Sequence, residues 1–89
     1  MAPPTPKTEA HIHIYATKKT ARIILASIGP EAETGISERS KAKLVEDEGG
    51  VAILIEADDV TALRAAVNSY LYWIKSVVDI ETELKKSEI

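Results

Sequence analysis

The segment from Val51 to Ile55 is apolar at every position, and it constrains the fold more than any other part of the chain. A strand with one solvent face carries a polar side chain at every second position, so a strand without polar positions belongs in the middle of a sheet. The preceding residues, Asp47-Glu48-Gly49-Gly50, are typical of a tight turn whose glycines accept positive φ. We therefore expect a hairpin whose second strand is central.

Two other segments, residues 10–16 and 39–46, show the alternation of a half-buried strand. Their apolar face holds Ile12, Ile14, Ala42 and Leu44. Their other face holds His11, His13, Tyr15, Lys41, Lys43 and Val45. We expect the first strand to pair with the central one, which gives an antiparallel sheet of order 1-3-2.

Two segments have the apolar spacing of amphipathic helices. The first follows Thr17, a residue type that caps helices, and we expect Gly29-Pro30 to end it, with residues 31–38 as a connector. The second follows Asp58-Asp59, which supply a cap and negative charge, and runs from about Val60 to Leu84. The predicted fold is α+β, a two-layer β-α-β-β-α arrangement with both helices on one sheet face.

Length and composition limit the number of domains and the kinds of site that the chain can form. A chain of 89 residues without cysteine forms one domain with a small core and no disulfide or thiolate metal site. We expect this domain at residues 10–84, between a flexible proline-rich tail at 1–9 and a flexible tail at 85–89. No apolar run approaches the roughly 20 residues that span a bilayer, and residues 1–9 lack the apolar stretch of a signal peptide, so we expect a cytoplasmic protein without a membrane segment.

The last helix has an apolar arc wider than one core contact needs. Its core stripe is Leu63, Val67, Tyr70, Ile74 and Val77, widened by Val60, Leu71 and Val78. Beside it runs a strip of small residues that ends in a large ring: Ala62, Ala66, Ser69 and Trp73. Small side chains let another helix approach, and an exposed tryptophan is a rigid anchor, so we expect this strip, together with Ile23 of the first helix, to bind a partner. Periodicity equally allows Trp73 to pack against the sheet or the first helix.

The same helix resembles a known family. The residues that carry the resemblance are Ile55-Glu56-Ala57-Asp58-Asp59, Ala62-Leu63-Arg64-Ala65, Asn68-Ser69-Tyr70-Leu71 and Trp73-Ile74. They are similar to the signature of the Pcc1-like family, the small dimerisation subunit of the KEOPS tRNA-modification complex, which is related to the cancer/testis antigens. Upstream, Ile14-Tyr15-Ala16-Thr17, Pro30-Glu31 and Arg39-Ser40 also fit, so the resemblance covers about residues 10–80.

The resemblance implies a non-catalytic scaffold that forms a homodimer through its sheet and binds the threonylcarbamoyl-transferase subunit through its two helices. It implies a role in N6-threonylcarbamoyladenosine formation at position 37 of tRNA, with tRNA met only within the complex. By position, Leu63, Val67, Leu71 and Trp73 would support the helical interface. Arg64 and Asn68 match polar positions that either remain solvated or contact protein or RNA.

The residues supply little that suggests catalysis or a cofactor. His11 and His13 share a strand face but lack a cysteine or a nearby third ligand, so we expect no metal site, no catalytic residue and no cofactor. The net charge of −3 argues against an autonomous nucleic-acid binder. An alternative function stays open, a small RNA-binding module acting through the sheet face that holds Lys41 and Lys43.

Overall fold

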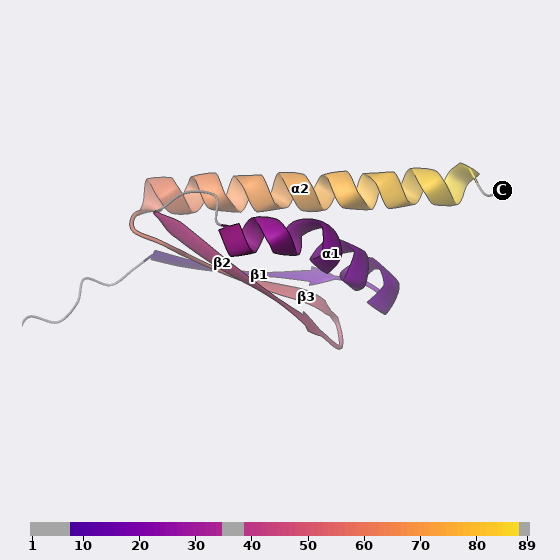
Figure 1. Cartoon of the computed structure of the whole chain (residues 1–89), viewed down its shortest axis with the longest axis horizontal. Coiled ribbons are helices and arrows are strands. Elements are labelled where there is room, and N and C mark those ends of the chain that lie inside the picture. The colour runs from indigo at the N-terminus through magenta and orange to yellow at the C-terminus, as the bar shows by residue number, and fades with distance from the viewer. Residues whose placement is uncertain (1–7, 35–38, 88–89) are drawn as a thin grey trace, which may run out of the picture.

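The computed structural model describes residues 8–34 and 39–87 and shows a sheet covered on one face by two helices (Figure 1). In chain order the elements are β1 (Thr8–Tyr15), α1 (Lys18–Thr34), β2 (Ser40–Asp47), β3 (Gly50–Ala57) and α2 (Val60–Ser87). Both neighbouring strand pairs are antiparallel, in the order β1-β3-β2. The predicted fold class, element order and strand order are therefore confirmed.

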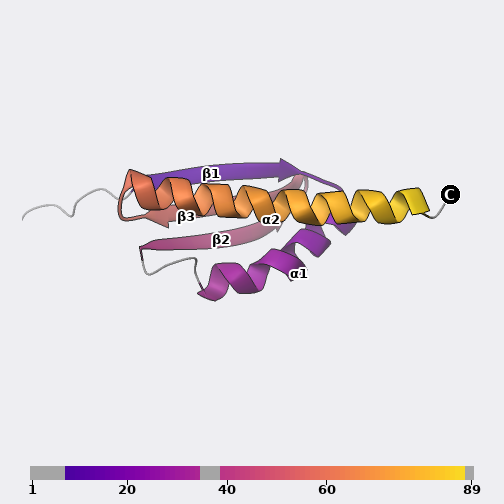
Figure 2. The same cartoon turned by 90° about the horizontal axis from the view of Figure 1, so that it is seen from above.

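β3 lies in the middle of the sheet because it buries side chains on both faces. On the helix side, Val51, Ile53 and Ile55 are at most 1% exposed. On the opposite face, Ala52 and Leu54 are half-buried. Seen from above, α2 runs along the strands while α1 lies on the β2 side (Figure 2).

The core forms where the two helices meet β3. Ile24 and Ile28 of α1 pack with Tyr70 and Ile74 of α2 against Ile53. Each large apolar side chain that is fully buried contributes about 1.5–3 kcal/mol relative to an exposed one. This shared core fixes α1 and α2 beside each other.

Both helix starts carry the caps expected from sequence. Thr17 Oγ1 accepts a hydrogen bond from the Thr20 amide at 3.3 Å, and Asp59 Oδ1 accepts one from the Ala62 amide at 2.8 Å. Each bond satisfies an amide that the first helical turn leaves without an intrahelical acceptor.

The end of α1 was predicted wrongly. The helix does not stop at Gly29-Pro30 but continues to Thr34, so residues 31–34 of the expected connector are helical. Proline removes one helical donor, yet Ala32 packs against the core, and this burial carries the helix past Pro30. Residues 35–38 of that connector lie outside the described residues.

The first strand and the last helix extend beyond the residues expected to form them. Thr8 and Glu9, assigned to the first tail, belong to β1, and α2 extends through Ser87. Residues 1–7 and 88–89 of the expected tails lie outside the described residues. Across the described part of the chain, neither helix combines the length and hydropathy required to cross a membrane.

Candidate functional site

A groove runs between α1 and α2 on the surface that faces away from the sheet's open side. The two helices run antiparallel (Figure 1), and Thr20 near the start of α1 donates a 2.9 Å hydrogen bond to Glu81 near the end of α2. The groove has a volume of about 220 Å³ and is lined by Ser27, Ile28, Glu31, Trp73, Ser76 and Val77. It combines an apolar floor with hydroxyl and carboxylate groups on its walls, which suits a helix of another protein.

Trp73 packs against the core and also lines the groove. Its ring packs on Tyr70 with centroids 5.3 Å apart and planes at 78°, an edge-to-face pair worth about 0.5–1.5 kcal/mol. The side chain also packs against the core cluster. Yet it is only half-buried, and its remaining surface lines the groove. Trp73 therefore belongs to the fold and to the groove at once.

The expected strip of small residues is not a continuous free surface. Ala66 is 1% exposed and belongs to the core. The reason is helical geometry, because Ala66 lies one turn before Tyr70 and so shares its buried face. Ala62 and Ser69 are half-buried. Ala66 therefore has almost no surface with which to contact a partner.

The other residues expected at the helical interface occupy varied positions. Ile23, Leu63 and Val67 are half-buried, and the latter two pack against the core. Leu71 is 43% exposed. The polar pair of this helix, Arg64 and Asn68, is exposed.

The groove also contains residues that sequence patterns did not single out, namely Ser27, Glu31 and Ser76. Their proximity depends on how α1 and α2 align in space. The antiparallel order places residue 27 opposite residue 76, and only the tertiary structure reveals that alignment. A serine on an amphipathic helix carries no signal of its own.

Tyr70 is an unusual core residue close to the groove, since it contacts Trp73. Its hydroxyl is buried and has no hydrogen-bond partner in the described structure. Burial, and secondarily the negative charge of Glu31, raises the pKa of the Tyr70 phenol above its ordinary value. The hydroxyl thus stays protonated at neutral pH and adds no charge to the core.

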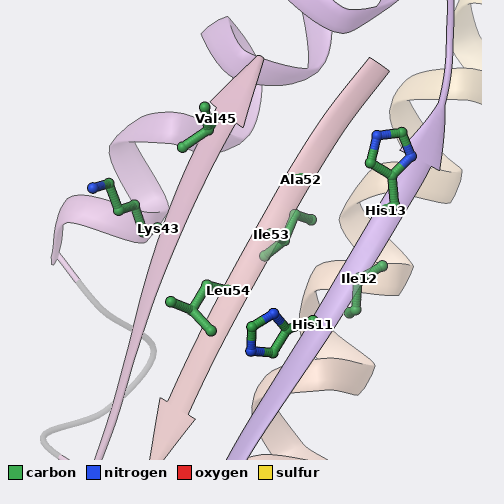
Figure 3. Close-up of a pocket in the computed structure, with 8 residues that line it drawn as sticks. All are labelled: His11, Ile12, His13, Lys43, Val45, Ala52, Ile53 and Leu54. Atoms are coloured by element: carbon green, nitrogen blue, oxygen red, sulfur yellow. The ribbon is translucent and has the colours of Figure 1, made fainter. Parts of the chain in front are cut away.

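The open face of the sheet is a second candidate surface. Alternation places His11, His13, Tyr15, Lys41 and Lys43 on this face, away from the helices. Figure 3 shows its centre, a hollow of about 390 Å³ in which Leu54 and Ala52 lie between the histidines of β1 and the β2 side chains Lys43 and Val45. An apolar centre with a polar border is typical of protein interfaces.

The charges on the open face are mixed. His13 Nε2 lies 2.8 Å from Asp47 Oδ2, and His11 Nε2 lies 3.6 Å from Glu9 Oε2. The hydrogen bond from His13 is the main reason why the pKa of Asp47 is below its ordinary value. This balance of acids and bases gives no support to an RNA-binding sheet face, since such surfaces carry a surplus of cations.

No cluster of three or more histidine, cysteine or acidic side chains that could hold a metal ion occurs among residues 8–34 and 39–87.

Comparison with known proteins shows which family the sequence matches. A family model described as "Transcription factor Pcc1" matches residues 11–81, from β1 into α2. The KEOPS complex subunit Pcc1 of Pyrococcus abyssi (strain GE5 / Orsay) is similar, with 30% identity over 66 residues. That alignment covers 74% of this chain and 80% of the archaeal protein.

Proposed function

The chain belongs to the Pcc1 family, and we propose that it is a non-catalytic, dimeric scaffold subunit of a KEOPS complex. In this role it binds the threonylcarbamoyl-transferase subunit and supports N6-threonylcarbamoyladenosine formation at position 37 of tRNA. It meets tRNA only within the complex. The resemblance seen in the motif of α2 leads to the same family as the two comparisons.

The observation that carries the proposal is the half-buried Trp73 in the groove between α1 and α2. The part of the ring that packs on Tyr70 fixes its orientation before any partner arrives. A preordered aromatic anchor loses little side-chain entropy on binding, and such anchors dominate the energetics of many interfaces. We assign this groove to a helix of the transferase subunit.

A matched pair of variants tests this assignment. Ser27 is an exposed residue that lines the groove, whereas its neighbour Ala26 is exposed and is not among the lining residues. Ser27→Arg places a long side chain in the groove and should weaken binding at least tenfold, about 1.4 kcal/mol. Ala26→Arg adds the same group elsewhere on α1 and should leave binding unchanged.

The measurement is titration of each variant with the purified transferase subunit, with circular dichroism as the check on folding. Equal affinities for the two variants would exclude the groove as the binding site. The pair is preferable to truncation of Trp73, because Trp73→Ala also removes a contact with Tyr70 and so disturbs the fold.

The open sheet face is the surface that we assign to the dimer. Its central side chains, Ala52 and Leu54, are apolar and half-buried, and Val45 beside them is 47% exposed. Packing a second sheet on this face would bury the three side chains between two layers, as in a β-sandwich. The two functions then use opposite sides of the molecule, so a dimer keeps both helical grooves accessible.

A further inference from the structure

The groove between α1 and α2 carries a negative charge in an otherwise neutral lining. Among the described residues that line it, Glu31 is the only charged one, and it lies on α1 one helical turn after Ser27. Trp73 and Ser76 of α2 belong to the same lining. Burial first, and the charge of Glu31 second, raise the pKa of the Tyr70 phenol, so the carboxylate acts close to the ring that contacts Trp73.

The polar groups of the groove are suited to accept hydrogen bonds. A carboxylate has about four acceptor positions and donates none when ionised, so Glu31 can bind a further donor beside its contacts within the chain. Ser76 Oγ donates its hydrogen to the backbone oxygen of Tyr72 at 3.0 Å, so this oxygen can only accept from a group in the groove. Two acceptors and a negative charge favour a cationic donor.

Trp73 narrows the choice among cationic donors. Its ring is half-buried, and its edge-to-face contact with Tyr70 holds it in place. A guanidinium is planar, carries five N–H donors and no acceptor, and stacks on an aromatic ring while it binds a carboxylate. The ammonium group of lysine is a compact, strongly hydrated charge with no plane for stacking. The groove therefore fits arginine better than lysine.

We propose that the groove receives an arginine side chain of the transferase subunit, with the guanidinium between the Trp73 ring and the Glu31 carboxylate. The Ser76 hydroxyl accepts a further N–H of the same group. This inference rests on the proposed function and names the chemical group that the groove recognises. Glu31 then sets the specificity, because a wholly apolar helix would cover the carboxylate without a cation to replace its lost hydration.

The test compares two variants that each remove one negative charge, in titrations with the purified transferase subunit. Glu31→Gln keeps the shape of the side chain and should weaken binding about 10- to 100-fold, the loss expected for a charge-assisted hydrogen bond. Glu48→Gln removes the same charge from the exposed β2–β3 turn and should change binding less than about twofold. The comparison separates the groove from the effect of net charge.

A chemical footprint identifies the group that the transferase subunit contributes. Phenylglyoxal modifies arginine, and acetic anhydride modifies lysine. In the complex with the wild-type chain, one arginine of the transferase should be protected from phenylglyoxal. In the complex with Glu31→Gln, prepared at a concentration that gives equal occupancy, the same arginine should regain reactivity. Mass spectrometry of the digested transferase measures both.

The outcomes separate this inference from the proposed function. Equal affinities for Glu31→Gln and Glu48→Gln, with Ser27→Arg still weakened, would overturn the arginine site and leave the groove as the binding surface. Protection of a lysine in place of an arginine would overturn it as well. A wild-type chain that does not bind the transferase would remove the proposed function and the inference together. Circular dichroism checks that each variant is folded.

Discussion

Gly50 begins β3 and pairs with Tyr15 at the end of β1. Its backbone φ of +144° is a value that residues with a side chain rarely adopt. A Cβ atom at this position would also lie only 1.9 Å from the backbone oxygen of Ile14. Gly50→Ala should therefore lower the free energy of unfolding by at least about 2 kcal/mol. Urea denaturation measures the loss.

A second glycine provides the control for that substitution. Gly29 lies within α1, and a Cβ there would meet nothing within 4 Å. Gly29→Ala should leave stability unchanged or raise it by up to about 1 kcal/mol through helix propensity. Equal losses from the two changes would contradict a specific clash at Gly50.

Removing the Tyr70 hydroxyl should not lower the free energy of unfolding, in contrast to the change at Gly50. Since its buried hydroxyl has no hydrogen-bond partner in the described structure, Tyr70→Phe removes a polar group that the fold leaves unsatisfied. We expect the free energy of unfolding to stay the same or rise by about 1 kcal/mol. A loss of more than about 1 kcal/mol in thermal or urea unfolding would show that the hydroxyl is satisfied in solution.

Asp47 contributes to the loss of folding stability at acid pH. Its pKa is held down mainly by the hydrogen bond from His13. A carboxyl whose folded pKa lies below its unfolded value stabilises the fold above the unfolded pKa, and this contribution is lost as pH falls through the folded pKa. Asp47→Asn should therefore flatten the fall in stability below about pH 4, measured by urea denaturation along a pH series. A slope identical to wild type would contradict this role.

At the scale of elements, the start of α2 depends on Asp59. One carboxylate oxygen caps the helix at the Ala62 amide, and the other pairs with Arg39 just before β2. Asp59→Ala should cost about 1–2 kcal/mol of stability, most of it from the cap. Asp59→Asn keeps a capping oxygen and should cost less than half as much. Similar losses for both variants would identify the charge pair, and not the cap, as the main contribution.

The elements differ in how far the sequence could predict them. The unbroken apolar run of β3 has only one suitable place in a small sheet, so the strand order could be predicted from that segment. The end of α1 could not, because Pro30 is a local signal for a stop while Ala32 obtains its burial from distant residues. Local propensity was overridden by tertiary packing.

The candidate site was predictable only in part, for a related reason. Periodicity identified an apolar arc on α2 that includes Trp73, but it could not decide which edge of the arc faces the sheet. Ala66 consequently proved to be a core residue. The groove residues Ser27 and Ser76 depend on the alignment of two helices, which no single segment encodes.

At the scale of the whole molecule, the sheet separates two surfaces of different character. The helical side presents a groove with an aromatic anchor, and the open side presents an apolar centre bordered by balanced charges. The proposed scaffold function requires both kinds of surface, one for a second copy of the chain and one for the enzyme. The small core suits this role, since a chain of 89 residues gains stability when its exposed apolar side chains are covered by partners.

The most direct test of the scaffold function is the mass in solution of the chain mixed with its transferase subunit, by light scattering after gel filtration. We predict one complex that contains two copies of this chain and two of the transferase, and a dimer when the chain is alone at neutral pH. A chain that remains monomeric and elutes apart from the transferase would contradict the account.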